Sequence, residues 1–269
     1  RCRRSTTPAM VADSFQAGTT ARCRSPICVR RIASAAVPDA SVTAVIVCSF
    51  EPPDAVASTV ESLMGQTRPP AEVLLVDNHP EAVVSTALVE RGLPVTQIVT
   101  GANLGYPQAC NSAAPHASGD WLFFLNPDAQ AAPDCLERLL EEAADDVGVL
   151  GAQVLLPDGT VNAGDNPVHL VGLSWSGRYL EPREDGPARD VACISGAASL
   201  IRAATFRALR GHSPGFFLYV DDTDIAWRSW LAGMRVRFVP RAVVSHDYEF
   251  DKGSRKWLHL EHNRLWMIL

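Results

Sequence analysis

The chain lacks any apolar run long enough to cross a membrane. A spanning helix needs about 20 consecutive, mostly apolar residues. Charged or turn-forming residues interrupt every apolar stretch of this sequence before that length. The sequence as given therefore predicts a soluble or peripheral protein.

Positive charge is also in short supply. The chain has 24 lysines and arginines against 30 aspartates and glutamates, which gives a net charge of −6 and an isoelectric point near 5.6. A protein that grips the phosphates of nucleic acid needs a basic surface. We therefore expect no general affinity for nucleic acid.

Two signature loops for phosphate groups are absent. The sequence contains neither G-x-G-x-x-G nor G-x-x-x-x-G-K-[ST]. The first is typical of dinucleotide-binding folds, and the second cradles the phosphates of nucleoside triphosphates. Dinucleotide-dependent and P-loop chemistry thus lose their main support in the sequence.

The cysteines form no recognisable framework. Neither a disulfide network nor a zinc site has its spacing here, because no two cysteines stand in a C-x-x-C pair. We interpret them as reduced thiols in a cytosolic protein. They are seven in number: Cys2, Cys23, Cys28, Cys48, Cys110, Cys135 and Cys193.

An ordinary globular composition accompanies these absences. The 269 residues are 47% hydrophobic and 20% charged, which suits a folded protein with a sizeable core. The first forty residues differ, because they carry seven arginines against two aspartates and show no sustained apolar period. We expect residues 1–40 to be a disordered basic segment and residues 41–269 to form a single domain.

Apolar runs alternate with helical patterns from Val42 onward. This repeat predicts an α/β fold with a parallel sheet and right-handed crossovers. The second half of the chain is less regular but still contains strand-like runs. The expected strands are Val42–Phe50, Glu72–Asp77, Val95–Val99, Trp121–Leu125, Val147–Leu156, Cys193–Ile201 and Val236–Val239.

The apolar run from Trp121 to Leu125 ends in a polar tip, Asn126–Asp128. Pro127 has no backbone N–H, so the sheet should stop there and the flanking side chains should project beyond its carboxyl edge. Open α/β sheets bind their ligands at that edge. Asp77 should reach the same edge, although a helix cap or an Asx turn explains this residue equally well.

A second acidic group consists of Asp221, Asp222 and Asp224. Three aspartates within four residues should raise at least one pKa, as a general base requires. Together with Asp128 and His246 they offer carboxylates and an imidazole, which suit Mg²⁺ or Mn²⁺. Helix capping by the aspartates and a structural role for the histidine are the alternatives.

The order of these motifs resembles the inverting glycosyltransferases of family 2, which have the GT-A fold. Within that family it is similar to bacterial rhamnosyl- and galactofuranosyltransferase-like members. The resemblance rests on an ordered set of segments: Val45–Phe50 with Leu63–Thr67, Val76–Asn78, Asn103–Gly105 with Asn111, Asn126–Asp128, Ser195–Gly196 with Leu200–Arg202, Tyr219–Asp224, His246–Phe250 and Glu261–Arg264. The sequence departs from the family pattern in four places. Asn126 replaces an aspartate, Asp221 replaces a glutamate, Tyr106-Pro107 stands where small residues are more usual, and His262 stands where such members often have arginine.

The resemblance implies a fold and a reaction. The fold would be a Rossmann-like GT-A domain whose central sheet is mostly parallel, with helices on both faces. The reaction would move a sugar from a UDP-, dTDP- or GDP-linked donor to a hydroxyl of a glycan or lipid-linked acceptor, in cell-wall or surface-polysaccharide synthesis. The expected place is the cytoplasm, with peripheral contact at the inner face of the membrane through Leu265–Leu269.

The resemblance also implies residue roles. Asp222 would be the catalytic base, with Asp221 and Asp224 orienting the acceptor and tuning the pKa of the base. The donor would be bound by Ser49, Glu51, Asp77, Asn103, Gly105, Asn111, Asn126 and Asp128. The metal, Mg²⁺ or Mn²⁺, would be held by Asp128, Asn126 and His246, and the acceptor would meet Ser195, Gly196, Trp227 and Arg228.

Two alternatives stay open. Asn126, and an apolar pattern that stops at Leu269 without a cap residue, also fit a truncated, catalytically degenerate module that binds sugar nucleotides. A nucleotidyltransferase would share the sheet, the metal and the acidic residues. The sequence disfavours it, because no glycine-rich, lysine-containing phosphate loop follows the first strand.

Overall fold

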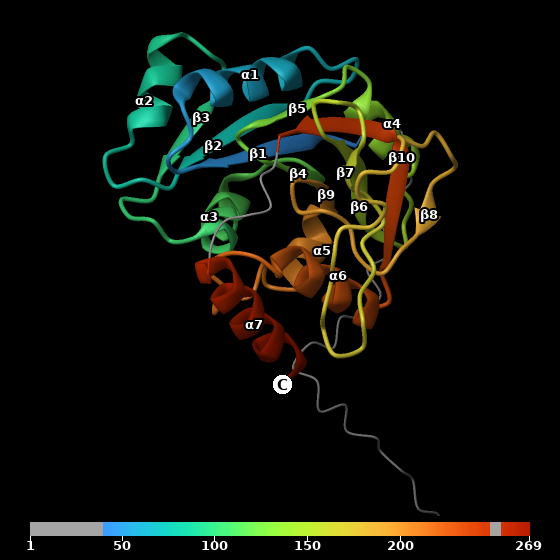
Figure 1. The fold of residues 1–269 in the computed structure, drawn as a ribbon. Helices are drawn as coiled ribbons and strands as arrows, with labels where there is room; N and C mark the ends of the chain where they lie inside the picture. The colour runs from blue at the N-terminus through green and yellow to red at the C-terminus, as the bar shows by residue number, and fades with distance from the viewer. Residues whose placement is uncertain (1–39, 248–253) are drawn as a thin grey trace, which may run out of the picture.

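Ten strands form one sheet in the computed structural model, which describes residues 40–247 and 254–269 (Figure 1). The segment expected to be disordered lies outside the described residues except for Ala40. Residues 248–250 of the family-like motif after His246 lie outside them too. Within the described part of the chain, no helix has the length and apolar character needed to cross a bilayer.

The elements alternate along the first half of the chain as predicted. The strands are β1 (Val42–Cys48), β2 (Glu72–Asp77), β3 (Thr96–Val99), β4 (Trp121–Leu125), β5 (Ala129–Ala131), β6 (Val147–Leu155), β7 (Val161–Ala163), β8 (Arg189–Asp190), β9 (Ala198–Arg202) and β10 (Arg235–His246). The helices are α1 (Pro53–Met64), α2 (Val83–Glu90), α3 (Tyr106–Ala113), α4 (Cys135–Glu141), α5 (Ala203–Ala208), α6 (Asp221–Leu231) and α7 (Ser254–Ile268), with a 3₁₀ turn over Ala114–His116.

The first four strands form the parallel part of the sheet. β2 lies between β3 and β1, and β4 pairs with the other edge of β1. All residues of β1 and β4 are buried, because helices cover a parallel sheet on both sides. The predicted parallel sheet with crossover helices is confirmed.

β9 interrupts this parallel order. It runs antiparallel between β4 and β6, and β10 then pairs in parallel with β6. The resulting order is β3-β2-β1-β4-β9-β6-β10-β5. The sheet is therefore mostly parallel, as expected, with an antiparallel strand inserted near its centre.

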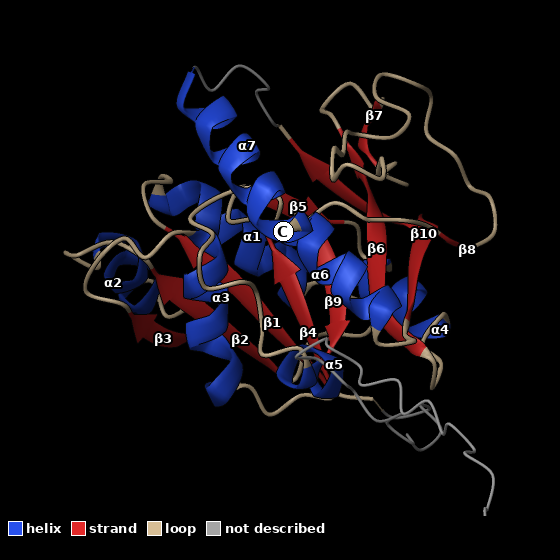
Figure 2. Cartoon of the chain, turned by 90° about the horizontal axis from the view of Figure 1, so that it is seen from below, coloured by secondary structure: helices blue, strands red, loops and turns tan. Residues whose placement is uncertain are grey.

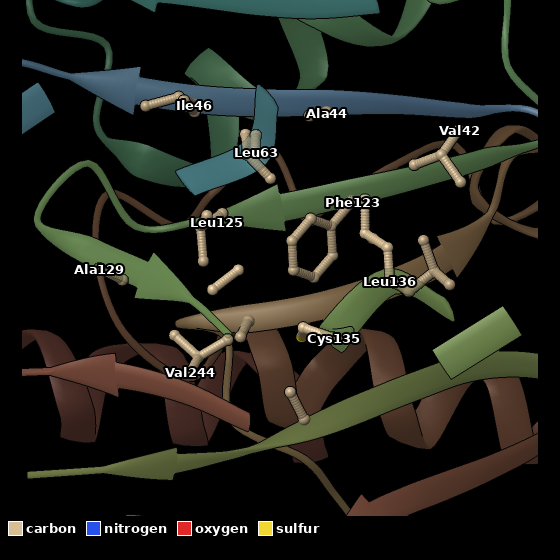
Figure 3. Packing of buried hydrophobic residues seen from close by; sticks show 14 of the residues in the cluster. Val42, Ala44, Ile46, Leu63, Phe123, Leu125, Ala129, Cys135, Leu136 and Val244 are labelled. Carbon is tan, nitrogen blue, oxygen red and sulfur yellow. The ribbon is translucent and has the colours of Figure 1, made fainter. Parts of the chain in front are cut away.

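Helices cover both faces of the sheet (Figures 1 and 2). α1, α2 and α4 contribute to the core on one face, where Leu63 and Leu136 pack with Phe123 (Figure 3). α3, α5 and α6 contribute to the core on the other face, where Phe206 packs with Phe124. Phe123 and Phe124 point to opposite faces because side chains alternate along a strand.

The strand predicted over Cys193–Ile201 is shorter than expected. Only Ala198–Arg202 forms a continuous strand. Cys193 makes an isolated bridge to Asn166, and residues 194–197 form a loop at the carboxyl edge of β4. There the carbonyl oxygen of Ala197 accepts a hydrogen bond from the backbone N–H of Asn126 at 2.9 Å. The glycine-containing half of the predicted strand thus belongs to the edge where ligands bind.

The strand predicted over Val236–Val239 is longer than expected. β10 extends to His246, because its pairing with β6 shifts register between Val239 and Val243 and then resumes. Pro240, which has no N–H to donate to the ladder, lies within that shift. The extension carries His246 to the carboxyl edge of the sheet.

Gly105 allows the loop before α3 to pack against the loop before α6. Its φ of +78° is left-handed, and a Cβ there would overlap the carbonyl oxygen of Phe217. That oxygen accepts a hydrogen bond from the Tyr106 N–H at 3.0 Å. We expect Gly105→Ala to lower the free energy of unfolding, measured in urea, by about 2 to 5 kcal/mol, because backbone strain and overlap add.

Gly101→Ala is the matched control for this prediction. Gly101 has a similar φ of +73°, but no atom lies within 4 Å of the position that its Cβ would take. This variant should lose only the roughly 1 to 2 kcal/mol of a left-handed alanine. Equal losses in the two variants would contradict the packing role of Gly105.

Candidate active site

A cleft of about 770 Å³ opens at the carboxyl edge of the sheet. Its walls come from the tips of β1 and β4, the end of β10, the loop before β9, the N-terminus of α6 and the start of α7. Figure 2 shows α7 on the same side of the sheet as α3 and α6. This is the edge at which open α/β sheets bind ligands.

Asp128 and His246 meet in this cleft. The pairing of β5 with β10 places His246 opposite Ala129, and Asp128 Oδ1 then lies 3.0 Å from His246 Nε2. The amide nitrogen of Asn126 lies 3.5 Å from the same imidazole nitrogen. The side chain of His246 is buried and that of Asp128 is half-exposed, so the carboxylate is the group that a ligand can reach.

These residues fit a partial metal site. Among residues 40–247 and 254–269, no three His, Cys, Asp or Glu side chains gather as metal ligands. Mg²⁺, however, usually keeps several waters and takes only one or two carboxylates together with phosphate oxygens of the substrate. Asp128 and His246, with Asn126 beside them, offer that kind of donor set.

The carboxylates of Asp221 and Asp222 line the same cleft from the first turn of α6. Two consecutive residues with left-handed backbone, Tyr219 (φ +70°) and Val220 (φ +66°), turn the chain into this helix. Asp222 Oδ2 accepts a hydrogen bond from the backbone N–H of Gly196 at 3.1 Å. The loop before β9 thus holds the acidic turn in place.

Burial raises the pKa of both carboxyl groups. Burial, together with the neighbouring Asp222 carboxylate, raises the pKa of Asp221 to about 8. Burial also raises the pKa of Asp222, but hydrogen bonds from the N–H groups of Gly196 and Thr223 and from the Thr223 hydroxyl oppose that rise. These hydrogen bonds favour the charged form of Asp222 over that of Asp221, so Asp222 is the member of the pair better suited to accept a proton.

The other acidic residue of the group, Asp224, does not line the cleft. Its Oδ2 accepts hydrogen bonds from the Arg228 guanidinium and from the Ser213 hydroxyl. Residues two positions apart on a helix point about 200° away from each other, so Asp222 and Asp224 cannot face one ligand together. Arg228 and Trp227, predicted to meet the acceptor, do not line the cleft either.

Among the residues predicted to bind the donor, Ser49, Glu51, Asn103 and Gly105 do line the cleft. Glu51 Oε2 accepts a hydrogen bond from the Ser49 N–H at 2.6 Å and so closes the turn after β1. Ser195 and Gly196, predicted for the acceptor, line the cleft as well.

Asp77 does not line the cleft, contrary to its predicted contact with the donor. The residue is fully buried. Its two carboxylate oxygens accept hydrogen bonds from the N–H groups of His79 at 3.2 Å and Ser85 at 2.8 Å. The second of these is an otherwise unpaired donor in the first turn of α2, so Asp77 serves as the cap that the sequence left as its alternative.

Asn111 also differs from its prediction as a donor-binding residue, because its side chain bonds the backbone of the protein. Its Oδ1 accepts a hydrogen bond from the His212 N–H at 2.8 Å, and its Nδ2 donates to the His212 carbonyl oxygen at 2.9 Å. The side chain thus ties α3 to the loop after α5 and does not line the cleft.

Asn78 lines the cleft, although the sequence placed it only in the family-like segment Val76–Asn78 and gave it no role of its own. Its Nδ2 donates to Asn103 Oδ1 at 3.1 Å and to the Ser49 hydroxyl at 3.3 Å, and its Oδ1 accepts the Leu104 N–H at 2.9 Å. It therefore joins three loops of the sheet edge. Its position directly after the end of β2 was the available signal.

Other lining residues gave no signal in the sequence. They come from β7, from the segment between β7 and β8 and from the start of α7, which lie far along the chain from the tips of β1, β2 and β4. They include Asn162, Asn166, Ser174, Trp175, Lys256 and Trp257.

Comparison with known proteins identifies the family of the chain. A family model described as "Glycosyl transferase family 2" matches residues 44–210. The N-acetylglucosaminyl-diphospho-decaprenol L-rhamnosyltransferase of Mycobacterium tuberculosis is 29% identical over 246 residues, which cover 81% of this chain and 80% of that protein. The O-antigen biosynthesis protein RfbC of Myxococcus xanthus is 29% identical over 83% of this chain, but the match covers only 19% of its own length.

Solved glycosyltransferases share the fold. A structure of GalNAc-T7 with UDP, GalNAc and Mn²⁺ superposes with a TM-score of 0.67 at 19% identity, over 79% of this chain and 44% of that one. The mannosyltransferase PcManGT from Pyrobaculum calidifontis, in complex with GDP-Man and Mn²⁺, gives 0.59 at 16% identity, over 91% of this chain and 66% of that one. These likenesses show the GT-A fold. With a family match over more than half of its length, the chain belongs to glycosyl transferase family 2 and is a glycosyltransferase.

Proposed function

We propose that this glycosyltransferase uses a metal ion, takes its sugar from a nucleotide-diphosphate donor and inverts the configuration at the anomeric carbon. The observation that carries the proposal is one cleft with two separate acidic groups. The first group is the pair Asp128 and His246, and the second group is the pair Asp221 and Asp222. The first suits a metal and a diphosphate, and the second suits a base.

The proposed donor lies along the carboxyl ends of β1, β2 and β4. The hydrogen-bonded set of Ser49, Asn78 and Asn103 would meet the nucleoside. The diphosphate would then lie near Asp128 and His246. The structures with UDP or GDP-Man and Mn²⁺ support a UDP- or GDP-linked donor. A dTDP-linked donor is the third candidate, which the resemblance implies.

In the proposed reaction, Asp222 takes the proton from a hydroxyl of the acceptor. The hydroxyl oxygen forms a bond to the anomeric carbon on the face opposite the diphosphate, and the bond from that carbon to the diphosphate oxygen breaks. Mg²⁺ or Mn²⁺ held by Asp128, His246 and Asn126 would stabilise the charge of the leaving diphosphate. Asp221 keeps its proton and so adds no second negative charge beside the base.

We propose a glycan or lipid-linked acceptor at the inner face of the membrane. The M. tuberculosis relative is named for an N-acetylglucosaminyl-diphospho-decaprenol, a saccharide on a lipid carrier. In this chain, α7 exposes Leu258 and Leu265. These residues are seven positions apart and share one helix face, which offers an apolar contact for a membrane surface.

The base assignment predicts the effect of Asp222→Asn. An amide cannot accept the proton, so turnover should fall by about 100- to 10,000-fold, while donor affinity should stay unchanged. The measurement is release of nucleoside diphosphate with the best acceptor from a panel of glycosides and lipid-linked sugars. Release of pyrophosphate instead would support a nucleotidyltransferase, and donor binding without turnover by the wild type would support the degenerate module.

The pH profile of the wild type gives an independent check on Asp222. Because burial raises its pKa, kcat/KM should fall with decreasing pH at a value above the range of about 4 that is ordinary for aspartate. Asp158→Asn is the control, since Asp158 is exposed and outside the cleft. Retained turnover in Asp222→Asn, or an acid limb at the ordinary value, would rule out this base.

The metal assignment predicts the effect of Asp128→Ala. Removing the reachable carboxylate should weaken binding of the donor in the presence of Mn²⁺ by at least about tenfold and leave binding in the presence of chelator unchanged. Calorimetric titration of UDP-, dTDP- and GDP-linked sugars, with Asp158→Ala as control, measures both. A wild type that binds its donor equally well with chelator would exclude the metal.

The membrane contact predicts the effect of a double substitution, Leu258→Glu with Leu265→Glu. Cosedimentation with vesicles of phosphatidylglycerol and phosphatidylethanolamine should fall by at least about tenfold, because apolar burial is lost and charge is added. Leu231→Glu is the control, since Leu231 is an exposed leucine of α6. An equal loss in the control, or no binding by the wild type, would refute the role of α7.

A further inference from the structure

One end of the cleft is lined by residues that the proposed reaction leaves without a role. They come from β7 and from the segment after it, and they combine amide, hydroxyl and indole groups. They are Asn162, Asn166, Ser174, Trp175 and Ser176.

Asn162 lines the cleft with an amide that awaits a partner. The residue is 5% exposed, and its Nδ2 makes no hydrogen bond within the described part of the chain. A buried N–H donor without an acceptor is unfavourable. The arrangement suits a ligand that brings an oxygen atom to this position.

The sheet topology places β7, which carries Asn162, next to the loop that holds Asp222. β10 pairs with one edge of β6 along its whole length, so β9 and β7 share the other edge. β9 pairs with residues 149–151 of β6, and β7 pairs with residues 154–155 beyond it. The loop that contains Gly196, whose N–H donates to Asp222, leads into β9. β7 therefore lies on the same edge of β6 as β9, next to the end of β9 that follows this loop.

Trp175 lines the cleft from a loop that is tied to the same acidic turn. Its side chain is 54% exposed. The neighbouring Ser174 hydroxyl lies 2.8 Å from the Thr223 hydroxyl, and Thr223 in turn donates to Asp222. Asn166 holds the base of the loop, because its Oδ1 accepts the Gly177 N–H at 3.1 Å.

A sugar ring matches this combination of groups. It has an apolar face of C–H groups, which packs on an aromatic ring, and an edge of hydroxyl groups, which needs amide and hydroxyl partners. We propose that Asn162, Asn166 and Trp175 bind a sugar ring of the acceptor beside Asp222. The attacking hydroxyl then belongs to a saccharide and not to a protein side chain or a lipid alcohol.

This inference rests on the proposed function, because inversion requires the acceptor on the face opposite the diphosphate. The diphosphate is assigned to Asp128 and His246, which leaves the Asp222 side of the anomeric carbon for the acceptor. The rival occupant of the subsite is the sugar of the donor itself. The two are separated by comparing how variants bind a nucleotide sugar and the bare nucleoside diphosphate.

The test is saturation-transfer NMR of the full chain with Mg²⁺ and the nucleoside diphosphate that binds best among UDP, dTDP and GDP. The probes are methyl glycosides of N-acetylglucosamine, glucose, galactose, mannose and rhamnose. Trp175→Ala and Asn162→Ala should each weaken binding of the preferred glycoside by about tenfold or more. Trp175→Phe should restore most of the affinity, and all variants should bind the nucleoside diphosphate normally.

Leu170→Ala is the control on the same loop, because Leu170 is exposed but does not line the cleft. The subsite is overturned if the wild type binds nucleotide but no glycoside, or if Trp175→Ala binds the glycoside as well as Leu170→Ala does. It is also overturned if Trp175→Ala loses affinity for the nucleotide sugar but not for the nucleoside diphosphate. Failure of the wild type to bind any nucleotide would instead contradict the proposed function.

Discussion

The register between β5 and β10 is the constraint on which the Asp128–His246 half of the site depends. Asp128 and His246 are 118 residues apart in the chain, and only the pairing of His246 with Ala129 brings them together. A shift of one residue would turn every side chain of β10 to the other face of the sheet. The register shift around Pro240, which lets β10 run on to His246, is therefore part of the site and not an irregularity beside it.

α7 provides a second constraint, on the half of the site that holds Asp221 and Asp222. The buried Asn263 donates from its Nδ2 to the carbonyl oxygens of Leu218 and Tyr219, at 2.9 and 2.8 Å. Those two carbonyls belong to the left-handed turn that leads into α6. The family-like segment Glu261–Arg264, to which the sequence alone gave no role, thus stabilises the backbone turn that directs Asp221 and Asp222 into the cleft.

The sequence predicted what depends on local pattern. Apolar runs located β1, β2 and β4, and the polar tip after Leu125 located Asp128 at the sheet edge, because both follow from strand periodicity and from the chemistry of proline. The sequence wrongly predicted that Asp77 and Asn111 bind the donor. Their side chains instead form hydrogen bonds with backbone groups of α2 and of His212. A polar residue at an element end looks the same in sequence whether it faces a ligand or the backbone.

Long-range pairing could not be predicted in the same way. The antiparallel direction of β9 is set by contacts with β4 and β6, which lie far apart in the chain. No periodicity encodes a partner strand. For the same reason, the sequence of the segment between β7 and β8 predicted only turns. The position of Trp175 in the cleft follows from the three-dimensional fold and not from the sequence.

The distribution of charge in the cleft accounts for the separation of its two acidic groups. Glu51, Asp128 and Asp222 bring negative charge, and Lys256 is the one lysine or arginine among the described residues that line the cleft. A diphosphate placed there would meet repulsion unless a cation lay between it and Asp128. The proposed base faces the opposite demand, because a cation beside Asp222 would lower its pKa and weaken it as a base. Burial of the Asp221–Asp222 pair away from the Asp128–His246 pair lets one cleft meet both demands.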